Sequence, residues 1–175
     1  MTFLSVLEQE YKKIPFLIVV PASTLGHWKR ELESWATRLI VVLYTGDEET
    51  RNLIARYEIF GGSARSTHKN ISCHVVLTSY ESIMRDTANF SSVQWEILVA
   101  DEGHRIKNEE SKGFAKLTGS IQSNHRVLMT GTPLQNNLKE LYTLMSFLVR
   151  YYWIDVQSKI ELRRLTKIVY TSRIL

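Results

Sequence analysis

Two adjacent acids, Asp101 and Glu102, are the side chains of this sequence best suited to chemistry. They directly follow residues 97–100, an apolar run typical of a strand buried on both faces of a parallel sheet. The acids therefore stand at the carboxyl end of a strand, where open α/β sheets bind ligands. Asp101 could hold hydrated Mg²⁺ on a nucleotide, and Glu102 could orient or deprotonate an attacking water. A strand end capped by two solvated acids is the simpler alternative.

Hydroxyl groups stand at two further junctions between an apolar run and a helix start. Ser23 and Thr24 come shortly after residues 16–20, and Thr78 and Ser79 end the run 74–79. A strand, hydroxyls and a helix start together form a corner that could bind phosphate. Plain capping of the helix by a hydroxyl is the simpler interpretation of the first pair.

The elements that must position these residues follow from the hydrophobic pattern. Strands are predicted at residues 16–20, 39–44, 74–79, 97–100 and 126–129. Helices are predicted at residues 1–13, 24–36, 48–60, 80–84, 110–121 and 138–149. Two helices have clear inward-facing sets, which are Leu25, Trp28, Leu32 and Trp35 in one and Leu53, Ile54, Tyr57 and Phe60 in the other. The strand–helix alternation predicts an α/β fold with a doubly wound, mainly parallel sheet.

Composition narrows the class of protein. The 175 residues are 44% hydrophobic and 23% charged, which suits one globular domain with a core. No apolar run approaches the roughly 20 residues that span a bilayer, so we expect no membrane partner. A single cysteine, Cys73, excludes an internal disulfide and favours a reducing compartment. The net charge of +4 resides in residues 150–175, so the neutral body gives no charge argument for nucleic-acid binding.

Four stretches in order carry a resemblance to a known family. They read IVVPASTL at 18–25, LTSYE at 77–81, DEGHRIKN at 101–108 and LMTGTPLQNN at 128–137. With them, residues 1–149 resemble the Swi/Snf-type ATPases of helicase superfamily two, the motors of chromatin remodelling and of some DNA repair. The last two stretches are the most specific. The helix end near residue 57 and the polar insert after it are similar to the chromodomain-helicase branch.

The resemblance implies a role for each matching residue. Asp101 would hold Mg²⁺ through water, Glu102 would activate water, and His104 would relay the nucleotide state toward DNA. A coupling motif that senses the γ-phosphate would comprise Thr130, Gly131 and Thr132, supported by Gln135 and Asn136. The phosphates of duplex DNA would be contacted by Ser23, Thr24, Thr78 and Ser79. The resemblance also implies ATP and Mg²⁺ as cofactors, duplex DNA and nucleosomes as partners, and a nuclear location.

The family also has a phosphate cradle, the Walker A loop G-x-x-x-x-G-K-[ST], ahead of a helix resembling residues 1–13. None of the eight glycines here is followed by lysine. The resemblance therefore implies an incomplete RecA-like lobe at 1–149, lacking its first strand and Walker A loop, without the second lobe that supplies an arginine. We expect this chain alone neither to bind nucleotide tightly nor to hydrolyse ATP at a useful rate. Because the first strand lies inside the RecA-like sheet, its loss would expose apolar edges and weaken the domain.

Residues 150–175 match no motif of the family. They predict either an amphipathic basic helix or a solvated basic segment. Two other functions stay open for the whole chain: a non-catalytic DNA- or protein-binding module, and a truncated gene product without an independent role.

Overall fold

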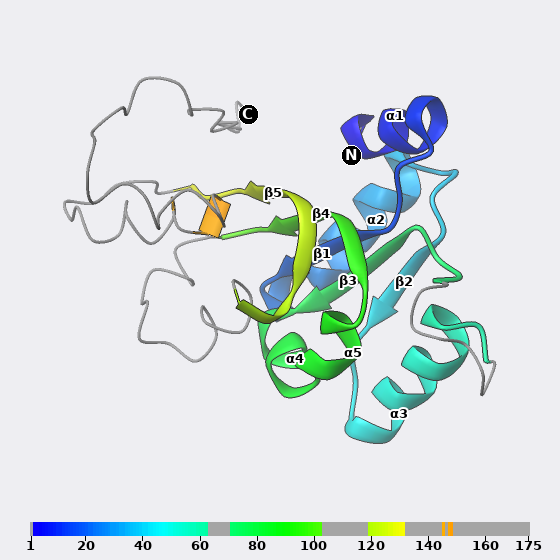
Figure 1. Cartoon of the computed structure of the whole chain (residues 1–175), viewed down its shortest axis with the longest axis vertical. Coiled ribbons are helices and arrows are strands. Elements are labelled where there is room, and N and C mark those ends of the chain that lie inside the picture. Colours follow the sequence, from blue (N-terminus) through cyan, green and yellow to red (C-terminus); the bar gives the residue numbers. More distant parts are fainter. Residues whose placement is uncertain (1, 63–70, 103–118, 132–144, 146, 149–175) are drawn as a thin grey trace.

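The sheet forms the centre of the molecule, as the computed structural model shows for residues 2–62, 71–102, 119–131, 145 and 147–148 (Figure 1). Its five strands run parallel in the order β2-β3-β1-β4-β5. They are β1 (Phe16–Val20), β2 (Val41–Tyr44), β3 (Val75–Ser79), β4 (Gln94–Ala100) and β5 (Gln122–Leu128). The prediction of an α/β fold with a parallel sheet is confirmed.

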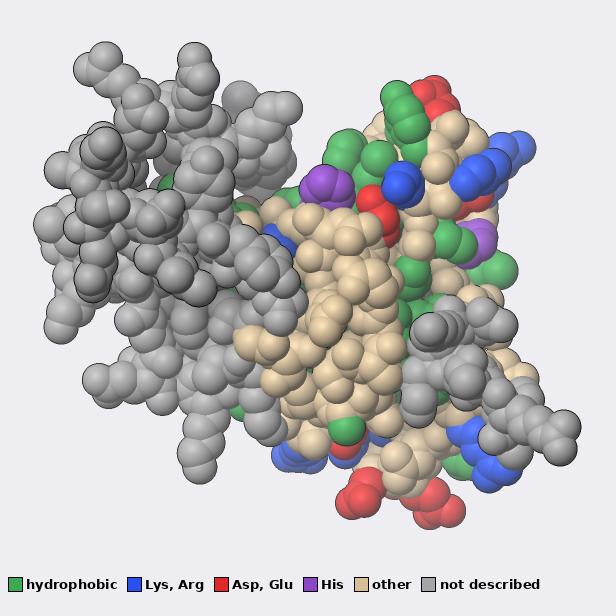
Figure 2. Space-filling model, in the orientation of Figure 1, with side chains coloured by type: hydrophobic (Ala, Val, Ile, Leu, Met, Phe, Trp, Pro, Cys, Tyr) green, Lys and Arg blue, Asp and Glu red, His purple; other side chains and the backbone are tan. Residues whose placement is uncertain are grey.

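Helices cover both faces of this sheet (Figure 1). They are α1 (Thr2–Tyr11), the 3₁₀ turn η1 (Ala22–Thr24), α2 (Leu25–Trp35), α3 (Glu48–Leu53), the π-helix η2 (Ile54–Ile59), α4 (Tyr80–Arg85) and α5 (Thr87–Ser91). One apolar cluster joins α1 and α2 to the sheet, and a second joins η2, α4 and α5 to its other face. Hydrophobic side chains also lie on the outer surface around α1, among charged ones (Figure 2), including Phe3 and Tyr11.

The central strand β1 explains why the apolar runs form this sheet. All five of its side chains are fully buried. Phe16 and Ile18 belong to the cluster under α1 and α2, whereas Leu17 and Val19 belong to the opposite cluster. A strand with apolar residues at every position can bury both faces only between two helical layers. The continuous apolar run, rather than an alternating one, therefore specifies the three-layer arrangement.

Some side chains predicted to face inward do not. Trp35 is 68% exposed, and Leu53 and Tyr57 are 52% and 55% exposed. In the helix that contains Leu53 and Tyr57, the helix type changes at Ile54. The Phe60 N–H there donates to the Ala55 carbonyl five residues earlier. The wider π turn takes more residues, so it shifts the buried face away from the pattern of a regular α-helix.

Other residues are buried in place of those that the α-helical pattern predicted. In η2 they are Ala55 and Ile59, and beyond α2 they are Ala36 and Leu39. Several predictions fall largely outside the described residues: the helices at 110–121 and 138–149 and the polar loop at 61–70. The segment 150–175 lies wholly outside them. Among the described residues, none of the helices has the length and apolar character needed to cross a membrane.

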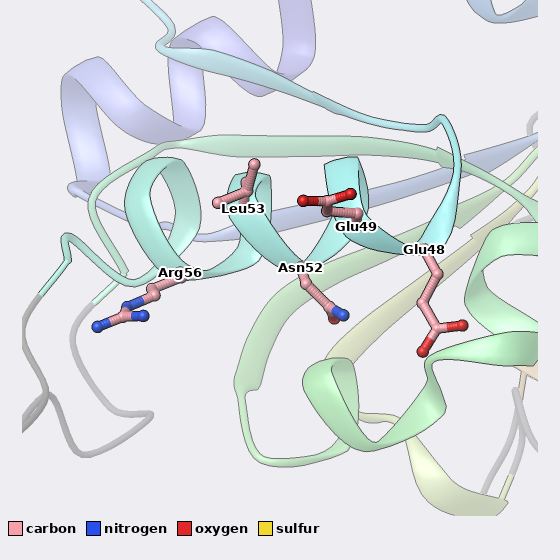
Figure 3. A pocket seen from close by; sticks show the side chains of 5 residues that line it. All are labelled: Glu48, Glu49, Asn52, Leu53 and Arg56. Carbon is pink, nitrogen blue, oxygen red and sulfur yellow. The ribbon is translucent and has the colours of Figure 1, made fainter.

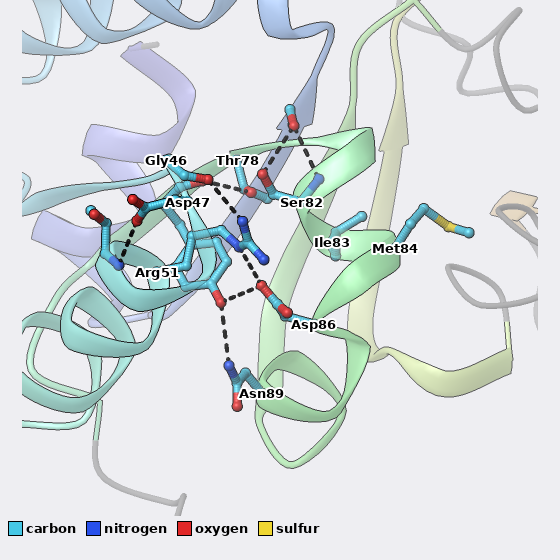
Figure 4. Close-up of polar contacts among 12 residues, drawn as sticks. Gly46, Asp47, Arg51, Thr78, Ser82, Ile83, Met84, Asp86 and Asn89 are labelled. Carbon is cyan, nitrogen blue, oxygen red and sulfur yellow. Dashed lines mark hydrogen bonds and ion pairs between the residues drawn. The ribbon is translucent and has the colours of Figure 1, made fainter.

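A buried ion pair ties α3 to the corner between α4 and α5 (Figure 4). Arg51 is 4% exposed, and its Nε donates to Asp86 Oδ2 at 2.6 Å while its Nη1 donates to the Gly46 carbonyl at 2.8 Å. The Tyr44 hydroxyl donates to the same carboxylate oxygen at 2.8 Å and accepts from Asn89 Nδ2 at 3.3 Å. We call these residues the Arg51–Asp86 network. They hold the segment after β2 against the segment after α4.

The network changes the acidity of its members in opposite senses. Burial opposes ionisation of Asp86, but hydrogen bonds from Arg51 and Tyr44 outweigh it and lower the pKa of the carboxyl group. Burial and the hydrogen bond to Asp86 raise the pKa of Tyr44 to about 12. The hydrogen bond to Asp86 raises the pKa of Arg51. The pair is therefore charged, and the phenol is protonated, across the physiological pH range.

Cys73 tests whether the core of the folded chain is closed to solvent. Its thiol is 1% exposed, and burial raises its pKa to about 12. Because the thiolate is the reactive form, we expect the folded chain to react with an aromatic disulfide reagent at least about 100-fold more slowly than free cysteine. The reaction should become fast in denaturing urea. Release of the coloured thiol product measures both rates, and fast reaction without urea would show that Cys73 is accessible.

Candidate functional site

The carboxyl ends of four neighbouring strands meet at one edge of the sheet. Three register pairs define this edge: Val20 with Ser79, Val19 with Ala100, and Ala100 with Leu128. The segments that leave the edge contain most of the predicted site residues. Ser23 and Thr24 follow β1, Thr78 and Ser79 end β3, Asp101 and Glu102 follow β4, and Thr130 and Gly131 follow β5.

Asp101 is held from several directions. The indole Nε1 of Trp28, on α2, donates to Asp101 Oδ2 at 2.8 Å. The backbone N–H of Glu102 donates to the other oxygen, Oδ1, at 2.9 Å. The phenol of Tyr80, on α4, donates to the Asp101 backbone carbonyl at 2.6 Å. Three donors therefore fix both the carboxylate and the main chain, as a group that must bind a ligand in a defined geometry requires.

Glu102 has an unusual backbone conformation. Its φ is +54°, in the left-handed region that disfavours a side chain with a Cβ, at a cost of roughly 1–2 kcal/mol. This reversal ends the strand, and the same residue supplies the N–H that binds Asp101 Oδ1. Strain of this kind persists where the surrounding contacts over-determine it, and it is concentrated at functional sites.

The two acids suit a hard divalent cation. Mg²⁺ in proteins takes one or two carboxylates, keeps several waters and takes further oxygens from phosphate. Within the described part of the chain, no group of three or more His, Cys, Asp or Glu side chains could hold a metal ion. The two carboxylates would therefore suit a Mg²⁺ that is brought in by a nucleotide and bound through water.

The four hydroxyl residues have different environments. Ser23 is exposed on η1, whereas the Thr24 hydroxyl donates to the Pro21 carbonyl at 3.0 Å. Thr78 is fully buried, and its hydroxyl donates to the Tyr44 carbonyl at 3.0 Å. Ser79 is 3% exposed and accepts from the Ser82 N–H at 3.1 Å, which makes it the N-cap of α4. Ser23 is thus the hydroxyl most available to a ligand, and contact of the others with phosphate stays a prediction.

A side-chain hydroxyl caps the start of α4 but not the start of α2. Thr24 occupies the N-cap position of α2, yet its side chain makes no cap hydrogen bond. The preceding 3₁₀ turn supplies carbonyl partners instead, because the Thr24 N–H donates to Pro21 and the Leu25 N–H to Ala22. The predicted hydroxyl cap at this position is therefore wrong.

Thr130 and Gly131 continue from β5 beside the acids. Thr130 is half-buried, and Gly131 is exposed. Among the described residues, a Cβ at Gly131 would meet no atom within 4 Å. Packing among the described residues therefore does not require glycine at this position. The remaining predicted residues lie outside the described residues; they are His104, Thr132, Gln135 and Asn136.

A shallow pocket on the outer side of α3 and η2 is unrelated to this edge (Figure 3). It measures about 470 Å³ and is lined by Glu48, Glu49, Asn52, Leu53 and Arg56. Two carboxylates against one guanidinium would repel the phosphates of a nucleotide. The pocket is therefore not a second candidate for the phosphate site.

Sequence reasoning missed the roles of Trp28 and Tyr80. The helical pattern assigned Trp28 to the buried face, and Tyr80 counted only as the start of a helix. Trp28 and Asp101 are 73 positions apart, and Tyr80 and Asp101 are 21 apart. The available signal was topological, since both aromatic residues open helices that leave the same sheet edge as the acids.

Comparison with known proteins agrees with this geometry. The family described as "SNF2-related domain" matches residues 1–161. The "CHD3-type chromatin-remodeling factor PICKLE" of Arabidopsis thaliana is 44% identical over 79% of this chain and 11% of its own length. The "Chromodomain-helicase-DNA-binding protein 3 homolog" of Caenorhabditis elegans is 46% identical over 85% of this chain and 9% of its own length. The solved "Sulfolobus solfataricus SWI2/SNF2 ATPase core in complex with dsDNA" is similar with a TM-score of 0.67 and 29% identity, over 83% of this chain and 27% of that one.

Proposed function

The chain belongs to the SNF2-related domain family, and from this premise we propose that it forms part of the ATP-binding lobe of a DNA-dependent chromatin-remodelling ATPase. The chain spans 11% and 9% of the length of two curated relatives that it matches. The reaction of the whole protein would be ATP hydrolysis that drives movement on duplex DNA. Nucleosomes would be its substrate, and the nucleus its location.

One observation carries the proposal. The carboxylate pair and the hydroxyl-bearing helix starts leave the same edge of one parallel sheet, and two donor side chains connect them through Asp101. In this role Asp101 holds Mg²⁺ through water, and Glu102 orients or deprotonates the attacking water. The exposed Ser23 and the half-buried Thr24, at the start of α2, contact the phosphates of one DNA strand. Such contacts position a motor without reading the base sequence.

The coupling residues complete the proposal. Thr130, Gly131 and Thr132 sense the γ-phosphate, and His104 relays the nucleotide state toward DNA. Gln135 and Asn136 support the same loop. Gly131 is exposed and continues from β5 beside the acids, which supports this role, because a residue that senses a ligand must be accessible to it.

The organisation of the chain is also part of the proposal. Residues 1–149 form a partial RecA-like lobe, and residues 150–175 form a separate basic segment. No lysine follows a glycine in the sequence, so these 175 residues contain no Walker A lysine for the β- and γ-phosphates. This observation also favours a second candidate function for the chain by itself, that of a DNA-binding module that does not use ATP.

Binding of duplex DNA tests both functions. We expect the 175-residue chain to bind a short duplex with an affinity that falls as salt rises and varies little between unrelated base sequences. Replacing the exposed Ser23 by Ala should weaken binding about tenfold, because a hydrogen bond to a charged phosphate is lost. Fluorescence anisotropy of a labelled duplex gives both affinities.

The matched control is Ser92→Ala. Ser92 is also exposed, but it lies just before β4, at the opposite edge of the sheet, and its hydroxyl donates locally to the Asn89 carbonyl. This variant should bind as the unmodified chain does. Equal affinities of all three chains would assign the binding to another surface, such as the basic segment 150–175, and no binding at all would contradict the proposed contact.

A further inference from the structure

We propose that Trp28 is a positioning residue that couples the Mg²⁺ acid Asp101 to the DNA-contacting start of α2, so that DNA binding and the state of the acid influence each other. Tyr80 provides a parallel link from the start of α4. The inference rests on the proposed function and deepens it, because it names the residues through which DNA would regulate the nucleotide site.

The position of Trp28 carries the argument. It lies in the first turn of α2, four residues after Thr24, and residues at this spacing share one face of a helix. The same helix is anchored by Leu25 and Leu32, which are 7% and 0% exposed, so its first turn moves as part of a packed element. The indole N–H is a donor only, and it is directed at Asp101 Oδ2 at 2.8 Å. A displacement of about 1 Å at the helix start would break this bond.

Tyr80 connects Asp101 to the other helix start. It is the first residue of α4 and directly follows the N-cap Ser79. Its hydroxyl donates to the Asp101 backbone carbonyl at 2.6 Å. The carboxylate of Asp101 is therefore bonded to the helix whose start is proposed to contact phosphate, and its main chain is bonded to the first residue of α4. No intermediate residue is needed to transmit a displacement from either helix.

Reciprocity makes the coupling measurable without ATP turnover. If DNA binding at the start of α2 affects Asp101 through the indole, a change at Asp101 that disturbs this hydrogen bond must in turn alter DNA affinity. Asp101→Asn also removes a negative charge, which by itself favours binding to DNA. That electrostatic effect does not depend on the indole N–H, whereas the coupling does. A double-mutant cycle separates the two effects.

The experiment measures duplex affinity by fluorescence anisotropy in the 175-residue chain. Trp28→Phe keeps an aromatic ring and removes the N–H. We expect the effect of Asp101→Asn on the dissociation constant to differ by about threefold between the unmodified and Trp28→Phe backgrounds. The control background is Trp95→Phe, which removes a buried indole N–H that donates to the Phe90 carbonyl at 3.0 Å, away from Asp101. There the effect of Asp101→Asn should equal that in the unmodified chain.

A second measurement is made on the unmodified chain, so its result holds even if a variant folds poorly. In the ¹⁵N-labelled unmodified chain, saturating duplex should shift the indole resonance of Trp28 and leave that of the buried Trp95 in place. The Trp28 signal is assigned by elimination with Phe variants of the other tryptophans. Equal effects of Asp101→Asn in all backgrounds, or a Trp28 resonance that stays fixed while the duplex binds, would overturn the inference and leave the proposed function intact. Absence of salt-dependent duplex binding would overturn both.

Discussion

The purified 175-residue chain is expected to release phosphate from ATP no faster than a control without protein, whether or not duplex DNA is present. In the proposed role Asp101 and Glu102 supply oxygens for Mg²⁺ and for water, but phosphoryl transfer also needs cationic and backbone N–H groups around the β- and γ-phosphates. No lysine follows any of the eight glycines, and the family's arginine from a second lobe is worth roughly 10³–10⁵ in rate in related enzymes. A coupled assay of phosphate release measures the rate.

Asp101→Asn, prepared in the same way, is the control for contaminating ATPase. Phosphate release by the unmodified chain that this variant abolishes would contradict the prediction. A chimera tests the acids themselves. It joins residues 1–149 to the phosphate cradle and second lobe that the resemblance to Swi/Snf-type ATPases implies, taken from a family member that contains both. We expect it to hydrolyse ATP, and Glu102→Gln to lower its kcat by about 10³-fold, the usual scale of general acid–base catalysis.

Asp86→Ala is expected to lower the free energy of unfolding by about 3 kcal/mol. The change leaves the buried Arg51 guanidinium without its carboxylate, and its remaining partners in the Arg51–Asp86 network, the Gly46 carbonyl and the Tyr44 side chain, are neutral. Loss of one partner of a buried pair costs about 3–5 kcal/mol, and the lower value applies because the Asp86 side chain is 18% exposed. Urea unfolding followed by circular dichroism at neutral pH measures the change.

Two variants control this measurement. Arg51→Met combined with Asp86→Ala removes both charges and should be less destabilising than Asp86→Ala alone. Glu33→Gln removes a partner from the exposed pair with Lys29, at 3.7 Å, and should cost less than about 0.5 kcal/mol. Because the pKa of Asp86 is lowered on folding, its stabilisation is present above its ordinary pKa and is lost as the pH falls through the lower value. An equal cost for Asp86→Ala and Glu33→Gln would show that the buried pair contributes little.

The sequence pattern predicted some strands better than others, for a physical reason. The run that forms β1 is apolar at every position and ends at Pro21, so both of its bounds were predictable. β5 was predicted at 126–129 but begins at Gln122, because its first half is polar. Asn124 there hydrogen-bonds Gln94 and Glu96 on β4 in place of apolar packing. Cross-strand polar contacts leave no periodic signal in one strand alone.

The sequence was enough to predict which types of residue stand at the strand ends that form the candidate site. Parallel pairing brings such ends together, so the order of strands and polar residues along the chain is enough to expect Asp101 near the hydroxyl residues. The bonds that organise the site were not predictable, because they join Trp28 and Tyr80 to a residue far along the chain. The π-helix at Ile54 was equally hidden, since no local pattern distinguished it from an α-helix.

The central position of β1 has a consequence for how the chain folds. β1 leaves the ribosome before both of its neighbours in the sheet, β3 and β4, whose first paired residues are Val75 and Ile97. At typical synthesis rates the segment FLIVV remains without a partner strand for on the order of several seconds. An uncharged, β-branched segment exposed for that time is prone to aggregation. The high contact order also predicts slow refolding in vitro, and refolding yield should rise with a chaperone that shields apolar segments.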